Sequence, residues 1–123
     1  MDTSKEYIEM CEKAGEIQNP HKLCSGDWFA DKKGQYCFCN ACLSSYMEGD
    51  EIYLPRQDQL QKMLDYRYPT DYAFNIGEWL KYLGIDQYNQ VNLYSMEQIW
   101  LAFVMKEKYN KIWNGEDWNT DGE

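Results

Sequence analysis

The cysteines between positions 37 and 42 are the residues whose types and spacing best suit chemistry. Cys37 and Cys39 alternate along a predicted strand, so they point to one face, and Cys42 follows just past its end. Thiolates bind zinc well, and Cys24 or His21 would complete a tetrahedral set. The spacing departs from paired Cys-x2-Cys knuckles, and half-buried thiols also pack like apolar side chains. A zinc site and a purely structural role both stay open, and the sequence indicates no other cofactor.

A catalytic arrangement is not recognisable in this sequence. A cysteine nucleophile needs a base, and His21 is the only histidine in the chain, in an Asn-Pro-His-Lys setting that predicts an exposed loop. Paired carboxylates such as Asp50-Glu51 and Glu116-Asp117 lie beside glycines, where solvated turn residues are common. No phosphate-binding glycine loop, serine elbow or dinucleotide fingerprint is present. We therefore assign no catalytic residue and predict a protein that is not an enzyme, with an enzyme of unrecognised type as an alternative.

The candidates for a protein-binding surface are polar residues at an expected helix start and tryptophans on short hairpin segments. An exposed indole on a rigid turn can anchor an interface. The same residues are explained without a partner by local pairing, by solvated helix formers and by tryptophans that cover a small core. The candidate residues are Arg56, Gln57, Asp58, Trp28, Trp113 and Trp118.

The charge of the chain restricts its partners. The 123 residues include 12 Lys and Arg against 21 Asp and Glu, a formal net charge of −9. Nucleic-acid binding depends on basic side chains that neutralise phosphates, so we expect no direct contact with nucleic acid or anionic lipid. An acidic surface can instead dock onto a basic protein groove, including one that normally holds nucleic acid. The alternative is that the charge provides solubility alone.

The sequence also indicates a cellular compartment. No basic segment followed by an apolar run opens the chain, so we expect no signal peptide. The longest apolar run, Ile99 to Met105, is far shorter than the roughly 20 residues that span a bilayer. An odd number of cysteines, five, without a secretion signal indicates free thiols. We expect a cytoplasmic protein with no membrane contact, and the oligomeric state stays open.

The predicted fold is organised around a helix from Ser95 to Asn110. Ser95 and Gln98 have the spacing of a capping box, and seven apolar residues follow. A helix that is apolar nearly all round is usually buried on more than one side. Lys106 and Lys108 then suit the negative end of the helix dipole. We therefore predict that this C-terminal helix is central to the core.

Three further helices and a small sheet are predicted. The first helix covers 3–18, capped by Thr3, and its narrow face containing Gly15 predicts that it leans on the domain from outside. The second starts with Pro55 in its first turn and runs to about Tyr66. The third follows a break at 68–71 and places Ile76, Trp79, Leu80 and Leu83 on one face, with Gly84 as its cap.

The strands are expected at 27–30, 35–39 and 52–54, as a three-stranded antiparallel sheet with Gly34 in its first turn. Asn114-Gly115 between two aromatic positions predicts a final hairpin, followed by a frayed tail from about Asn119. Together these elements predict one compact α+β domain over residues 1–123, with about four helices around the central helix and a small antiparallel sheet.

Three stretches carry a resemblance to a known family. Tyr53 to Leu64 contains LPRQDQLQ, and SMEQIWLAFVMKEKY followed by WNGEDW lies between Ser95 and Trp118. The opening Tyr7 to Gln18 is also similar. These stretches resemble small acidic proteins, of uncharacterised activity, that are encoded by phages and prophages of Gram-positive bacteria. The resemblance covers under half of the chain. It implies an origin in a phage or prophage genome and action in the bacterial cytoplasm.

These observations lead to a prediction of function. We expect a phage accessory protein that is a protein-binding module without catalysis. A specific hypothesis is an acidic antagonist of a host defence or nucleic-acid-handling protein, motivated by the charge and the resemblance. The alternative is a small zinc-stabilised structural or regulatory module, which depends on the cysteines described above.

Overall fold

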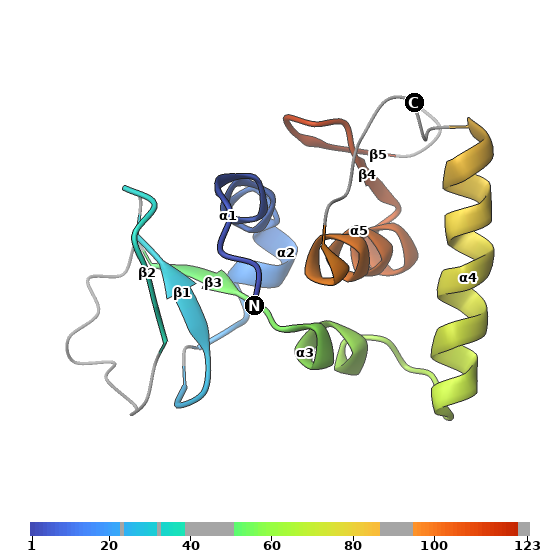
Figure 1. Cartoon of the computed structure of the whole chain (residues 1–123), viewed down its shortest axis with the longest axis horizontal. Coiled ribbons are helices and arrows are strands. Elements are labelled where there is room, and N and C mark those ends of the chain that lie inside the picture. Colours follow the sequence, from blue (N-terminus) through green and yellow to red (C-terminus); the bar gives the residue numbers. More distant parts are fainter. Residues whose placement is uncertain (23, 32, 39–50, 87–94, 121–123) are drawn as a thin grey trace. The chain divides into compact units, whose positions relative to one another are not determined.

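The computed structural model describes residues 1–22, 24–31, 33–38, 51–86 and 95–120 (Figure 1), with the backbone alone at residues 36–38 and 82–86. Helices and short antiparallel strands make up these ranges, which confirms the α+β class. Contacts divide the chain into two compact units, Met1–Arg56 and Gln57–Glu123. A single domain over the whole chain stays a prediction. Within the described ranges, no helix is both long and apolar enough to cross a bilayer.

The first unit combines two short helices with the predicted three-stranded sheet. The sheet is antiparallel with strand order β2-β1-β3, and Trp28 on the middle strand faces Phe38 on one side and Leu54 on the other. The strand that is last in sequence therefore pairs with the first, and β3 is an edge strand. The elements are α1 (Lys5–Glu12), α2 (Gly15–Gln18), β1 (Trp28–Ala30), β2 (Tyr36–Phe38) and β3 (Ile52–Leu54).

The turn between β1 and β2 forms for the local reason that the sequence indicates. The side-chain oxygen Oδ1 of Asp31 accepts hydrogen bonds from the backbone N–H groups of Lys33 (2.9 Å) and Gln35 (3.0 Å). Gly34 has a φ of +86°, a conformation that L side chains rarely adopt. The prediction that Gly34 makes this hairpin turn is confirmed.

The N-terminal helix differs from its prediction in two ways. Its cap is Ser4, whose hydroxyl accepts from the Tyr7 N–H at 3.2 Å, and not Thr3. The helix breaks at Ala14, which has a φ of −90° and a ψ of 72°, so the predicted helix at 3–18 is two helices. Tyr7 and Cys11, on the face predicted to pack inward, are completely buried, as is Met10.

The second unit contains the predicted central helix. The Ser95 hydroxyl accepts from the Gln98 N–H at 3.1 Å, and residues 100–105 are all buried. Asn110, with a φ of +55°, ends the helix by donating its N–H to the Lys106 and Met105 carbonyls. This helix packs against the short helix Gln57–Lys62, two helices before it in sequence, and against the strand Lys111–Trp113 that follows it. The elements are α3 (Gln57–Lys62), α4 (Pro69–Asp86), α5 (Met96–Tyr109), β4 (Lys111–Trp113) and β5 (Trp118–Thr120).

Three predicted helix ends in this part of the chain are wrong. Pro55 is not in the first turn of α3, which begins at Gln57. It directly follows β3, and its carbonyl accepts from the Tyr7 hydroxyl. Gly84 does not cap α4, which continues to Asp86. A glycine ends a helix only where the backbone turns left-handed, and otherwise continues it at some cost. A break between the two helices is present, but it lies earlier than the predicted 68–71: α3 ends at Lys62 and not at about Tyr66, and Pro69 is already the first residue of α4.

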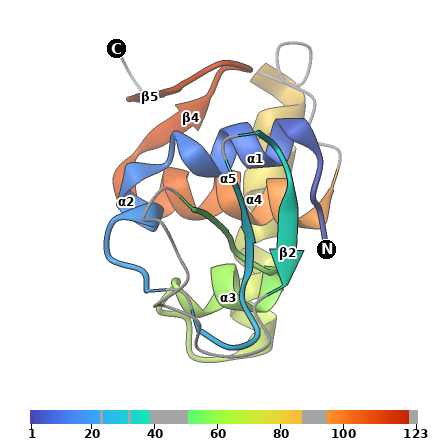
Figure 2. The ribbon, with the colours of Figure 1, turned by 90° about the vertical axis from the view of Figure 1, so that its left-hand side faces the viewer.

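The C-terminal hairpin forms as the Asn-Gly pair predicts (Figure 2). Oδ1 of Asn114 accepts from the N–H groups of Glu116 and Asp117 at 2.8 Å each, and Gly115 has a φ of +100°. Trp113 and Trp118 face each other across the strands, with ring centroids 5.1 Å apart. The pairing continues through Asn119 and Thr120, beyond the point where the sequence indicated fraying.

Candidate functional site

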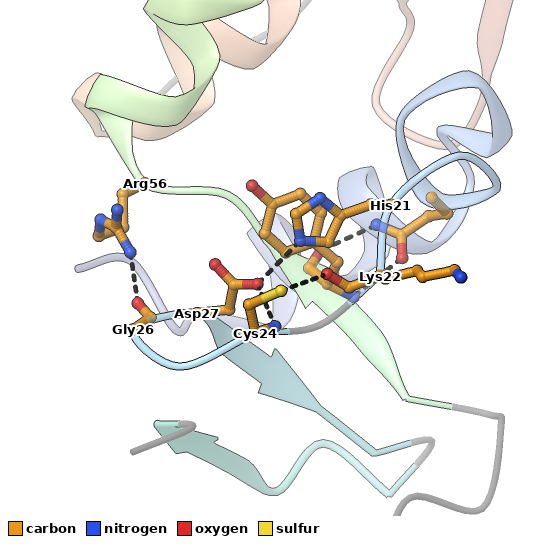
Figure 3. A network of polar contacts seen from close by, with 8 residues as sticks. His21, Lys22, Cys24, Gly26, Asp27 and Arg56 are labelled. Atoms are coloured by element: carbon orange, nitrogen blue, oxygen red, sulfur yellow. Dashed lines mark hydrogen bonds and ion pairs between the residues drawn. The ribbon is translucent and has the colours of Figure 1, made fainter. Parts of the chain in front are cut away.

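The loop between α2 and β1 holds a polar network (Figure 3), which we call the His21 loop; it comprises His21, Cys24, Gly26 and Asp27. Asp27 is 4% exposed, and its Oδ2 lies 2.8 Å from both the Cys24 backbone nitrogen and Nε2 of His21. The Asp27 N–H donates back to the Cys24 carbonyl at 3.0 Å. A buried carboxylate needs such donors to offset its lost hydration. Asp27 is therefore the centre around which this loop closes.

The imidazole of His21 is held on two sides. Its ring stacks on the Tyr53 ring of β3, with centroids 3.6 Å apart and planes 4° from parallel. Because Nε2 faces the Asp27 carboxylate, the neutral ring carries its proton on Nε2 and a lone pair on Nδ1. Among the described residues, no side chain or backbone group bonds to Nδ1. This nitrogen is thus able to accept a hydrogen bond or to bind a metal ion.

The sequence predicted His21 in an exposed loop and missed this arrangement. The side chain is 27% exposed. Its partner Asp27 lies six residues further on, at a position that the sequence predicts as the start of a strand. The signal that could have indicated the loop was the Pro20 and Gly26 pair that brackets it, since both residues favour turns. Gly26 has a φ of +96°, and the Arg56 guanidinium donates to its carbonyl.

The side chain of Gln18, at the end of α2, forms hydrogen bonds with the backbone of the edge strand β3. Its Nε2 donates to the Tyr53 carbonyl and its Oε1 accepts from the Tyr53 N–H, both at 2.8 Å. One amide thus replaces a neighbouring strand at this position, which protects an edge that would otherwise invite pairing. The buried Tyr7 hydroxyl donates to the Pro55 carbonyl at 2.6 Å. These bonds fix α1, α2 and β3 as one framework beside the His21 loop.

The predicted zinc ligands are described only in part. Cys39 and Cys42 lie outside the described residues, and Cys37 is described only by its backbone in β2. Cys24 is exposed, and its thiol donates to the Lys22 carbonyl at 3.4 Å, so it does not pair with His21. The described residues contain no group of three or more His, Cys, Asp and Glu placed to hold a metal ion. Zinc binding stays a prediction.

The residues predicted to bind a partner are divided between the two units. In the first unit, Trp28 is half-buried and Arg56 is engaged with Gly26. In the second unit, Trp113 is 2% exposed and belongs to the core, while Trp118 is half-buried against it. At the start of α3, Gln57 is half-exposed and Asp58 exposed. Partner binding by these six residues stays a prediction.

A groove of about 590 Å³ lies in the first unit between α1 and the turn that joins β1 to β2. Ile8 and Ile52 supply its apolar part. Its charged lining balances, because three lysines oppose three carboxylates, so the groove selects neither cations nor anions by net charge. These charged residues are Lys5, Lys13, Lys33, Glu9, Glu12 and Asp31.

In the second unit, Tyr66 has a perturbed pKa. Burial raises the pKa of this phenol, and the charge and hydrogen bonding of Glu107 raise it further. A tyrosine whose pKa is raised stays protonated at neutral pH. Tyr66 is therefore a hydrogen-bond donor at neutral pH.

Comparisons with known proteins do not assign a family or a function to this chain. No family model, curated protein or solved structure matches the chain.

Proposed function

We propose that this chain is a phage or prophage accessory protein that acts in the bacterial cytoplasm by binding another protein, without catalysing a reaction. The observation that carries this proposal is the distribution of acidic residues over both units. Residues 1–56 contain 10 Asp and Glu against 6 Lys and Arg, and residues 57–123 contain 11 against 6, so the units carry −4 and −5. An excess of one sign over a whole surface steers association toward partners of the opposite sign.

Several of these carboxylates are available to a partner. Glu12 on α1 and Asp65 after α3 are exposed, and neither carboxylate pairs with another described side chain. Glu12 projects from a helix whose opposite face is buried and whose Tyr7 is bonded to the Pro55 carbonyl. Because the backbone that holds Glu12 is already ordered, binding there costs little conformational entropy. The partner that fits is a protein with a basic groove.

The specific form of the proposal is antagonism of a host defence or nucleic-acid-handling protein. Such a protein presents lysines and arginines where phosphates normally bind. Carboxylates that occupy this groove would compete with the nucleic acid. The support for this form is the charge of −9 together with the resemblance to phage-encoded proteins.

The test is an affinity capture of the tagged full chain from a Gram-positive host lysate, at about 50 mM and about 500 mM salt, with mass spectrometry of the bound proteins. We expect one host protein that is released by salt. A double variant, Glu12→Lys with Asp65→Lys, should weaken capture, and Lys22→Glu, at an exposed position, should strengthen it. Equal capture at both salt concentrations would refute the electrostatic form, and no specific capture would refute protein binding itself.

A second candidate function, the zinc-stabilised module, is favoured by one observation. Asp27 holds Nε2 of His21 and leaves Nδ1 for a ligand, which is how carboxylates orient metal-binding histidines. His21 would then be the fourth ligand beside Cys37, Cys39 and Cys42. Metal analysis of chelator-free protein tests this candidate: we expect about one zinc per chain that is lost in His21→Ala. Four freely titrating thiols without zinc would end it.

A further inference from the structure

We draw no further inference here: the strongest candidate, the Nδ1 nitrogen of His21 in the loop between α2 and β1, to which no described residue bonds, belongs to the zinc site already described as the second candidate function.

Discussion

At the scale of single residues, the Tyr7 hydroxyl makes the clearest test of a buried bond. It donates to the Pro55 carbonyl at 2.6 Å, and both residues are completely or nearly completely buried. Tyr7→Phe removes the donor and leaves a buried carbonyl without it, so we expect a loss of about 1–2 kcal/mol in the free energy of unfolding, measured by urea denaturation. Tyr68→Phe is the control, since Tyr68 is 55% exposed, and should change stability by less than about 0.5 kcal/mol. Equal losses in both variants would contradict this account.

The buried thiol of Cys11 makes stability depend on alkaline pH. Burial raises the pKa of Cys11 far above its ordinary value. The unfolded chain releases this proton near pH 8.5 and the folded chain retains it, so unfolding becomes more favourable as pH rises. We expect a loss of about 1.4 kcal/mol for each pH unit above about 8.5 from this group.

The measurement is urea denaturation between pH 7 and pH 10 for the wild type and Cys11→Ala. The variant should be less stable at pH 7 because it leaves a cavity, but its stability should fall less steeply at high pH. Parallel pH profiles would show that Cys11 does not contribute.

Local backbone conformations were predictable, and the pairing of side chains across a loop was not. Gly34 and Gly115 have the positive φ that their turns indicate, and Ser95 caps the helix that its spacing indicates. The Asp27–His21 pair was missed because both residues also fit local roles, as a strand start and an exposed loop. Nothing in a single sequence shows that a buried carboxylate will be satisfied by a particular histidine, since that depends on the path of the backbone between them.

At the scale of secondary-structure elements, the backbone hydrogen bonding at the outer edge of β3 depends on the side chain of Gln18. Gln18 satisfies both backbone groups of Tyr53, so Gln18→Ala leaves a donor and an acceptor unpaired at the sheet edge. We expect a loss of about 1–3 kcal/mol and faster amide hydrogen exchange at Tyr53.

Gln18→Glu provides a finer version of this test. A carboxylate still accepts from the Tyr53 N–H but cannot donate to the Tyr53 carbonyl, whereas the protonated acid can. The folded state therefore raises the pKa of the introduced acid above about 4.3, its value in the unfolded chain. The difference from wild type should shrink as pH falls through the raised pKa towards about 4.3. A difference that stays constant from pH 7 to pH 4 would mean that the donor role of Gln18 is unimportant.

The existence of the elements was predictable, but several of their ends were not. The three strands and the C-terminal hairpin lie where alternation and turn residues indicate. The break at Ala14 and the continuation of α4 through Gly84 both go against local propensity, because alanine favours helix and glycine disfavours it. Packing of a whole element decides such positions, and a window of sequence does not contain that information.

At the scale of the whole molecule, the net charge of −9 should itself oppose folding. Like charges repel more in the compact state than in the expanded one, and salt screens them. The screening length falls from about 30 Å at 10 mM salt to about 8 Å at 150 mM. We expect Tm to rise by about 2–5 °C between these concentrations, measured by calorimetry, with NaCl and KCl giving the same result. A Tm that falls with salt would show that attractive pairs outweigh the repulsion.

The α+β class was predictable from the sequence because it depends only on the types of element present. The division at Arg56 was not, since no linker composition marks it and β3 leads into α3 over two residues. Function was the level least predictable from the sequence, because charge and resemblance indicate only a kind of partner.

The turn at Asn114–Gly115 contains a residue pair whose slow deamidation can report how often the hairpin opens. Asn-Gly sequences deamidate readily: the following amide nitrogen attacks the side-chain carbonyl carbon and ammonia leaves, which forms a succinimide. Water then opens the succinimide to aspartate or isoaspartate, with a small net gain in mass. In the folded hairpin, Oδ1 of Asn114 accepts two backbone hydrogen bonds. We expect this attack to require release of both bonds and an opening of the turn. The rate of mass gain at this site during storage would then report how often the hairpin opens, without any label or denaturant.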